Sequence, residues 1–176
     1  MTDEQRYNKA LEFATLKHSG QMRKGGEPYI THPITVSQYV RDKGLGIDYQ
    51  IAALFHDLLE DTDATEQEIL ELSNVDVLEA VKLLTKQDGY VMADYVEAIK
   101  NNPIAFEVKE SDRLHNLRSA FCTSAEFKRK YILETVDWYL DFSKEIRVAV
   151  KELAQSLDAP MTEMSFLYEP IDSWKL

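Results

Sequence analysis

The feature that most constrains this chain is an apolar segment that ends in a cluster of ionisable side chains. Residues 51–59 are apolar apart from His56 and Asp57, and Glu60 and Asp61 follow directly. The apolar part has no polar stripe, which predicts a helix buried on most sides. On a helical period the four ionisable side chains converge at one end of that helix. Buried carboxylates need compensation, and a bound cation would supply it.

A simpler interpretation is that these residues only end the helix and face the solvent, which is common for an isolated His-Asp pair. Three more histidines occur elsewhere, and each taken singly is more often a core or surface residue than a metal ligand. A second polar group, Asp112, Asn116 and Ser119, shares one face of a predicted helix over residues 103–120. The choice between a metal site and a solvated helix end therefore depends on how these segments combine.

Few breaks interrupt the chain, which has six glycines and five prolines in 176 residues. No run of alternating apolar and polar residues is long enough for a convincing strand. The sequence therefore predicts an all-α fold, a single compact helical bundle over residues 1–157. Residues 158–176 form a tail that we expect to be irregular but packed, because it combines two prolines with several aromatic side chains.

Local signals place several helix ends. Asp48 is expected to cap the central helix. Thr65 and Glu68 have the spacing of a capping box. Residues 127–157, which are rich in aromatic side chains, predict one long helix or two.

Charge and cysteine content exclude several classes of protein. With 20 basic and 31 acidic residues, the net charge is −11, which argues against broad binding to nucleic acid. No apolar run approaches the roughly 20 residues of a membrane span, and the N-terminus has no signal-peptide pattern. The single cysteine, Cys122, rules out an internal disulfide and is expected to lie in the core. These features favour the cytosol, and the sequence leaves the oligomeric state open.

The ordered combination of polar segments resembles a known family. His32-Pro33, His56-Asp57 and Asp112 are the marks of HD-domain metal-dependent phosphohydrolases. More specifically, the chain resembles the hydrolase domain of RelA/SpoT homologues in their small stand-alone alarmone hydrolase form. The resemblance covers roughly residues 5–142, and its blocks are residues 20–33, 52–62, 84–86 and 108–116.

This resemblance implies a set of site residues and a metal. The family's metal ligands fall on His32, His56, Asp57 and Asp112. The family's usual ion is Mn²⁺, although another divalent transition metal would suit these ligands. The two carboxylates that act on the attacking water fall on Glu60 and Asp61.

The resemblance also implies a nucleotide substrate. The family's nucleoside pocket falls on Arg23, Lys24 and Asn116, and Ser119 replaces a usual threonine. Other basic side chains could offset phosphate charge, namely Lys109, Arg113 and Arg118. Glu110-Ser111 stands where the family usually has small or apolar residues.

The implied activity is removal of the 3′-pyrophosphate from guanosine tetra- or pentaphosphate, which gives GDP or GTP and pyrophosphate. The sequence contains no synthetase domain, so only the hydrolytic half of alarmone turnover is expected. One alternative is an HD phosphohydrolase for another nucleotide, such as a deoxynucleotide or a phosphorylated dinucleotide. The other is a non-catalytic regulator that binds nucleotides, although a complete ligand set argues against it.

Overall fold

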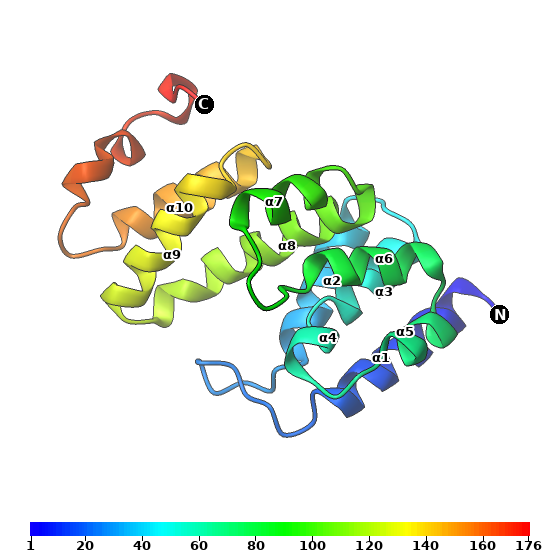
Figure 1. The fold of residues 1–176 in the computed structure, drawn as a ribbon. Helices are drawn as coiled ribbons and strands as arrows, with labels where there is room; N and C mark the ends of the chain where they lie inside the picture. Colours follow the sequence, from blue (N-terminus) through cyan, green and yellow to red (C-terminus); the bar gives the residue numbers. More distant parts are fainter. The chain divides into compact units, whose positions relative to one another are not determined.

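Helices form all of the regular structure in the computed structural model, which describes residues 1–176 (Figure 1). The α-helices are α1 Asp3–Lys17, α2 Thr31–Asp42, α3 Ile47–Phe55, α4 Leu58–Asp61, α5 Glu66–Leu72, α6 Val75–Leu84, α7 Met92–Lys100, α8 Pro103–Ser119, α9 Ala125–Trp138 and α10 Lys144–Gln155. Three short 3₁₀ helices span Ala120–Cys122, Thr162–Tyr168 and Ile171–Ser173. The prediction of an all-α fold is confirmed. None of the helices combines the length and the apolar character needed to cross a membrane.

The chain divides into two compact units, Met1–Asp112 and Arg113–Leu176. Helix α3 is the centre of the first unit, where α1, α2 and α6 pack against it (Figure 1). All five residues from Ile51 to Phe55 are fully buried, as the apolar sequence predicted. Burying a large aliphatic or aromatic side chain contributes about 1.5–3 kcal/mol. This segment therefore fixes the helix end that carries His56.

The predicted helix through residues 51–62 is not continuous, because α3 ends at Phe55 and α4 begins at Leu58. His56 and Asp57 form a turn between them. His56 Nδ1 lies 2.7 Å from the carbonyl oxygen of Ala53, which is the acceptor that the amide of residue 57 would use in an unbroken helix. This competition accounts for the interruption. The expected helical spacing of the four ionisable residues is thus only approximate.

Two predicted helix caps have different outcomes. Asp48 does not cap α3, whose N-cap is Gly46 without a side-chain hydrogen bond. The Asp48 carboxylate instead accepts hydrogen bonds from Arg6 at 2.6 Å and from Asn74 at 3.0 Å, and so ties α3 to α1 and to the start of α6. The capping box of Thr65 and Glu68 is confirmed at the start of α5.

The second unit consists of the end of α8 together with α9, α10 and the C-terminal tail. Helix α10 buries one face against α9 and against the 3₁₀ segment Thr162–Tyr168. Within the tail, Met161 and Leu167 are buried, and the Tyr168 hydroxyl accepts a hydrogen bond from the amide of Met161 at 3.0 Å. The domain boundary expected at residue 157 stays a prediction.

Arg113 is a structural residue of this second unit. Its guanidinium lies 4.3 Å from the ring centre of Tyr131 and 4.1 Å from that of Tyr139, and it donates to Glu134 Oε1 at 2.6 Å. The residue is only 3% exposed. Its predicted role against phosphate charge is therefore wrong, because the group is enclosed and already paired with a carboxylate. Cys122 also differs from expectation, since it is exposed rather than in the core.

Candidate metal centre

Four residues from separate segments of the first unit meet around one point. His32 lies in the first turn of α2, His56 and Asp57 form the turn after α3, and Asp112 lies on α8. His32 Nε2 is 3.2 Å from His56 Nε2 and 3.1 Å from Asp112 Oδ1. His56 Nε2 is 3.0 Å from Asp57 Oδ2 and 3.7 Å from Asp112 Oδ1. The structure thus brings together all four residues that the family resemblance assigns to the metal.

The spacing of these atoms fits a small divalent cation. Atoms that bind an ion at about 2.0–2.2 Å in tetrahedral or octahedral geometry lie about 3.0–3.5 Å from one another. The two imidazole nitrogens and the Asp57 carboxylate oxygen are grouped within 4.8 Å of one another, and Asp112 adds a second carboxylate beside them. Two nitrogens and two carboxylate oxygens suit a borderline divalent ion. The residues present therefore fit the divalent metal that the family resemblance implies.

The charges of the cluster show what a cation would compensate. Burial alone would raise the pKa of Asp57, but the charge and hydrogen bond of His56 outweigh burial and hold this pKa below its usual range. Lys109 and the two imidazoles likewise hold the pKa of Asp112 well below its usual range, against the effect of burial. Both carboxylates are therefore ionised at neutral pH. They are thus available as anionic ligands.

The two imidazoles respond differently to the same surroundings. Burial lowers the pKa of His32 more than its hydrogen bond with Asp112 raises it. For His56, the charges and hydrogen bonds of Asp57 and Asp112 outweigh burial and raise the pKa to about 10. The two carboxylates thus favour positive charge beside them, which a proton on His56 can supply in part. A divalent cation would take over this compensation.

The two predicted catalytic carboxylates, Glu60 and Asp61, have different environments. Asp61 is beside the cluster, because its Oδ2 lies 3.3 Å from the Tyr29 hydroxyl that also contacts Asp57. Burial and the charges of Asp57 and Glu60 raise the pKa of Asp61, which makes this carboxylate a better proton acceptor. Glu60 and Asp61 are both exposed, but Glu60 Oε2 accepts a hydrogen bond from the backbone amide of Lys86 at 2.9 Å. Glu60 therefore also anchors the segment after α6.

The unusual Glu110 has a structural partner. It is only 2% exposed and forms an ion pair with Lys43, which follows the last turn of α2. Lys43 also donates to Glu107 Oε2 at 2.8 Å. These contacts tie the end of α2 to α8, and so connect the two helices that carry His32 and Asp112. A buried carboxylate at this position is thus compensated within the first unit.

The connection between α1 and α2 is a small hairpin. The amide of Arg23 donates to the carbonyl oxygen of Glu27 at 2.8 Å, and Gly26 has a φ of +87°, which favours glycine. Arg23 is half-buried and Lys24 is exposed near the tip. Their contact with a nucleoside stays a prediction.

Asn116 and Ser119 lie on the part of α8 that belongs to the second unit. Asn116 is half-buried, one turn after Asp112 on the same helix. The Ser119 hydroxyl donates to the carbonyl oxygen of His115 at 2.9 Å, which satisfies its donor within the helix. Their role in substrate binding is likewise still a prediction.

Three residues support the site although their roles were not predicted from the sequence. The Tyr29 hydroxyl donates to Asp57 Oδ2 at 2.6 Å, and Gln21 Nε2 donates to the backbone carbonyl oxygen of Asp61 at 2.7 Å. His18 packs on the ring of Tyr29. The signal in the sequence was that Gln21 and Tyr29 lie in the block of residues 20–33, which carries the family resemblance and ends with His32 and Pro33.

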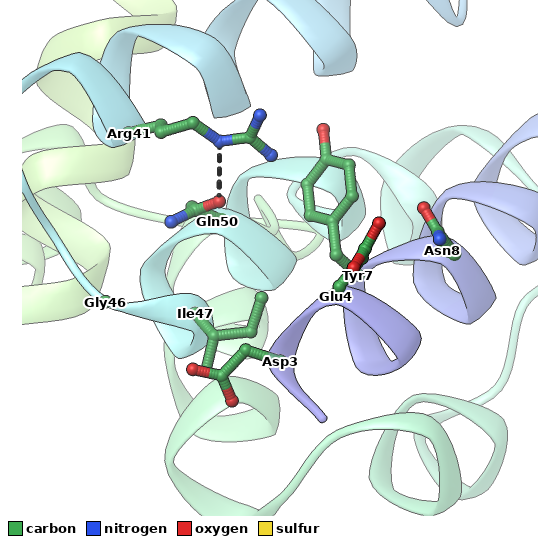
Figure 2. Close-up of a pocket in the computed structure, with 8 residues that line it drawn as sticks. All are labelled: Asp3, Glu4, Tyr7, Asn8, Arg41, Gly46, Ile47 and Gln50. Carbon is green, nitrogen blue, oxygen red and sulfur yellow. Dashed lines mark hydrogen bonds between the residues drawn. The ribbon is translucent and has the colours of Figure 1, made fainter. Parts of the chain in front are cut away.

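A separate hollow of about 480 Å³ lies at the other end of α2 from His32, between the starts of α1 and α3 (Figure 2). Arg41 is its single basic side chain, and it already donates to Gln50 Oε1 at 3.0 Å and covers the ring of Tyr7. The residues that line the hollow are Asp3, Glu4, Tyr7, Asn8, Arg41, Gly46, Ile47 and Gln50. None of the predicted metal, catalytic or nucleoside-binding residues is among them.

The profile of the HD domain family matches residues 10–146, which is most of the chain. The chain belongs to the HD domain family. In this HD domain the matched range contains all four clustered residues, His32, His56, Asp57 and Asp112.

Several curated relatives of this chain have names that refer to guanosine polyphosphates. The chain is 34% identical over 148 residues to a guanosine-3′,5′-bis(diphosphate) 3′-pyrophosphohydrolase of Aquifex aeolicus, covering 80% of this chain and 21% of the relative. It is 33% identical over 145 residues to the bifunctional (p)ppGpp synthase/hydrolase SpoT of Escherichia coli, covering 76% of this chain and 21% of the relative. The HD domain thus spans about one fifth of the length of these relatives.

A solved structure shares the fold. It is a metazoan ortholog of SpoT, described as hydrolyzing ppGpp, and it matches with a TM-score of 0.69 at 24% sequence identity. The match covers 85% of this chain and 94% of that chain. Nearly the whole chain of the metazoan protein therefore has the same fold as this chain.

Proposed function

We propose that this HD domain is a divalent-metal-dependent phosphohydrolase that removes the 3′-pyrophosphate of guanosine tetra- or pentaphosphate. The products would be GDP or GTP and pyrophosphate. The observation that carries the proposal is the convergence of His32, His56, Asp57 and Asp112, with the carboxylate of Asp61 beside them. The curated relatives, described as acting on this nucleotide, support the choice of substrate.

Mn²⁺ is the proposed ion, held by the two imidazoles and the two carboxylates of the cluster. When bound, such an ion polarises a phosphoryl oxygen and lowers the pKa of water. The ionised state of Asp57 and Asp112 supports this assignment, because metal ligands must be deprotonated. A different divalent transition metal would use the same four groups.

Proton transfer is the proposed task of Asp61, assisted by Glu60. Asp61 would accept the proton of the attacking water, and its raised pKa supports this role at neutral pH. In this step the water oxygen forms a bond to the phosphorus attached to the ribose 3′ oxygen, and the bond between that phosphorus and the 3′ oxygen breaks. The 3′ oxygen takes up a proton, so that the nucleotide leaves with a free 3′ hydroxyl and pyrophosphate is released. A general base placed in this way contributes about 10²–10⁴-fold to the rate.

Recognition of the nucleoside is proposed for Arg23, Lys24, Asn116 and Ser119. Arg23 and Lys24 lie in the hairpin whose ends contact the site through Gln21 and Tyr29, which supports a position near the substrate. The amide of Asn116 can donate and accept hydrogen bonds with a ribose or base. In an acidic protein, local cations of this kind are needed to attract a nucleotide.

The test is a turnover screen of the purified protein against a panel of nucleotides, each with Mn²⁺, Mg²⁺, Zn²⁺ or Co²⁺. The panel contains guanosine tetra- and pentaphosphate, deoxynucleoside triphosphates and a phosphorylated dinucleotide, and Asp57→Ala serves as the inactive control. Fastest turnover of the two guanosine polyphosphates with Mn²⁺ supports the proposal. Preferred hydrolysis of another nucleotide contradicts the substrate, and binding without any turnover favours a regulator.

A further inference from the structure

The Tyr29 hydroxyl touches the metal cluster and the candidate base at once. Its oxygen is 2.6 Å from Asp57 Oδ2 and 3.3 Å from Asp61 Oδ2. Asp57 Oδ2 is also the atom that faces the ring nitrogen of His56, at 3.0 Å. A phenol has one proton to donate, so the shorter contact identifies Asp57 as its acceptor. The hydrogen bond therefore reaches the carboxylate oxygen that points into the proposed metal position.

Buried neighbours hold the ring of Tyr29 in place. The ring centre lies 4.8 Å from that of His18 and 5.9 Å from that of His32. His18 is only 2% exposed, although it is remote in sequence from the proposed ligands. Rings packed at these distances restrict both the tilt and the position of the hydroxyl. Tyr29 is thus aimed at Asp57 by packing as well as by its hydrogen bond.

The orientation of His18 follows from its hydrogen bond with Gln21. Gln21 Nε2 donates to the backbone carbonyl oxygen of Asp61 at 2.7 Å, which leaves Gln21 Oε1 as an acceptor. His18 Nδ1 lies 2.7 Å from this Oε1, so Nδ1 must carry a hydrogen. A connected set of contacts therefore runs from His18 through Gln21 to the backbone of Asp61. A second set runs from His18 through the ring of Tyr29 to the carboxylate of Asp57.

We propose that Tyr29 is a positioning residue, which fixes the coordinating oxygen of Asp57, and that His18 holds Tyr29 in this position. The proposal rests on the metal site proposed above, but it does not depend on which nucleotide is the substrate. Partners that orient metal ligands through hydrogen bonds contribute about 10–100-fold to metal affinity or activity. Tyr29 has the geometry of such a partner.

The test is a calorimetric titration of Mn²⁺ into Tyr29→Phe, without any nucleotide, because this change removes only the hydroxyl. We expect Mn²⁺ affinity to fall about 10–100-fold. Tyr7→Phe is the matched control, since Tyr7 lies on α1 beside the remote hollow, and we expect its Mn²⁺ affinity to equal that of the unmodified protein. Wild-type Mn²⁺ affinity in Tyr29→Phe, whether or not its thermal stability falls, overturns the proposal.

His18→Phe tests the second part. It keeps an aromatic ring against Tyr29 but removes the hydrogen bond to Gln21, so we expect Mn²⁺ affinity to fall severalfold. An unchanged affinity in His18→Phe contradicts the role of His18. Both titrations stay informative if the protein turns over no guanosine polyphosphate, because they measure metal binding alone. Failure of the proposed substrate and failure of the proposed positioning can therefore be told apart.

Discussion

Glu60 carries two roles that a pair of substitutions can separate. Its Oε2 accepts a hydrogen bond from the amide of Lys86, which is a structural contact, and its carboxylate is also a candidate for handling the attacking water. Glu60→Gln removes the charge but keeps an oxygen that can accept from Lys86. Glu60→Ala removes both. If Glu60 acts in catalysis, both variants lose activity, whereas only Glu60→Ala loses stability.

The expected magnitudes follow from the contacts. One solvent-accessible hydrogen bond contributes about 0.5–1.5 kcal/mol to the free energy of unfolding. In a chain of this length, each kcal/mol shifts Tm by about 2–4 °C, so Glu60→Ala should lower Tm by about 1–6 °C. Glu60→Gln should leave Tm nearly unchanged. Loss of a carboxylate that assists proton transfer lowers turnover by about 10²–10⁴-fold.

The assay measures the initial rate of pyrophosphate release with saturating Mn²⁺, together with thermal unfolding by circular dichroism. Glu79→Gln, an exposed carboxylate on α6, is the control for a change of surface charge. A wild-type rate in Glu60→Gln would refute the catalytic role and leave Glu60 as a structural residue. A large fall in Tm for Glu60→Gln would instead attribute its loss of activity to misfolding.

Four further predictions concern the metal, the base, the second unit and the nucleoside. Asp57→Ala should abolish bound metal while leaving helicity intact, and elemental analysis that still finds one ion per chain contradicts the ligand assignment. A general base acts in its deprotonated form, and the pKa of Asp61 is raised. We therefore expect kcat/KM to fall as the pH decreases, with a midpoint above the ordinary pKa range of aspartate. A value of kcat/KM that stays constant down to pH 4 would show that Asp61 is not the base. Arg113→Met should lower the free energy of unfolding by about 2–4 kcal/mol, because it removes two cation–π contacts and the ion pair with Glu134. A double-mutant cycle with Glu134→Gln, measured by denaturant unfolding, refutes the ion pair if it shows no coupling energy. Asn116→Ala should weaken discrimination among nucleotides by about 1–3 kcal/mol without loss of metal, and unchanged kcat/KM ratios would remove Asn116 from the nucleoside site.

The fold class could be predicted because its determinants are local. Each of these determinants acts over a few residues: the apolar segment before His56, the small number of glycines and prolines, and the capping box of Thr65 and Glu68. In the structure the apolar segment is buried and the capping box is present. The break between α3 and α4 could not be predicted in this way. It depends on a side chain, His56, that competes for a backbone acceptor.

Contacts between distant segments explain the remaining differences. Arg113 was expected to offset phosphate charge, because the sequence does not show that two aromatic rings and a carboxylate of α9 and the following turn enclose it. Asp48 has the right residue type for a helix cap, yet Arg6 and Asn74 use its carboxylate. The role of Tyr29 could not be predicted for the same reason, since its hydrogen-bond partner Asp57 is 28 positions away in the sequence. His56 and Asp57 were indicated by a local signal, the ionisable end of an apolar helix, whereas their combination with His32 and Asp112 was predicted from the family pattern.

The most direct test of the central claim is the identity of the products formed from guanosine tetraphosphate with Mn²⁺, measured by anion-exchange chromatography and ³¹P NMR. We predict that GDP and pyrophosphate appear in equal amounts, and that Asp57→Ala forms neither. Release of inorganic phosphate in place of pyrophosphate, or no turnover of guanosine tetraphosphate beside rapid hydrolysis of another nucleotide, would contradict it.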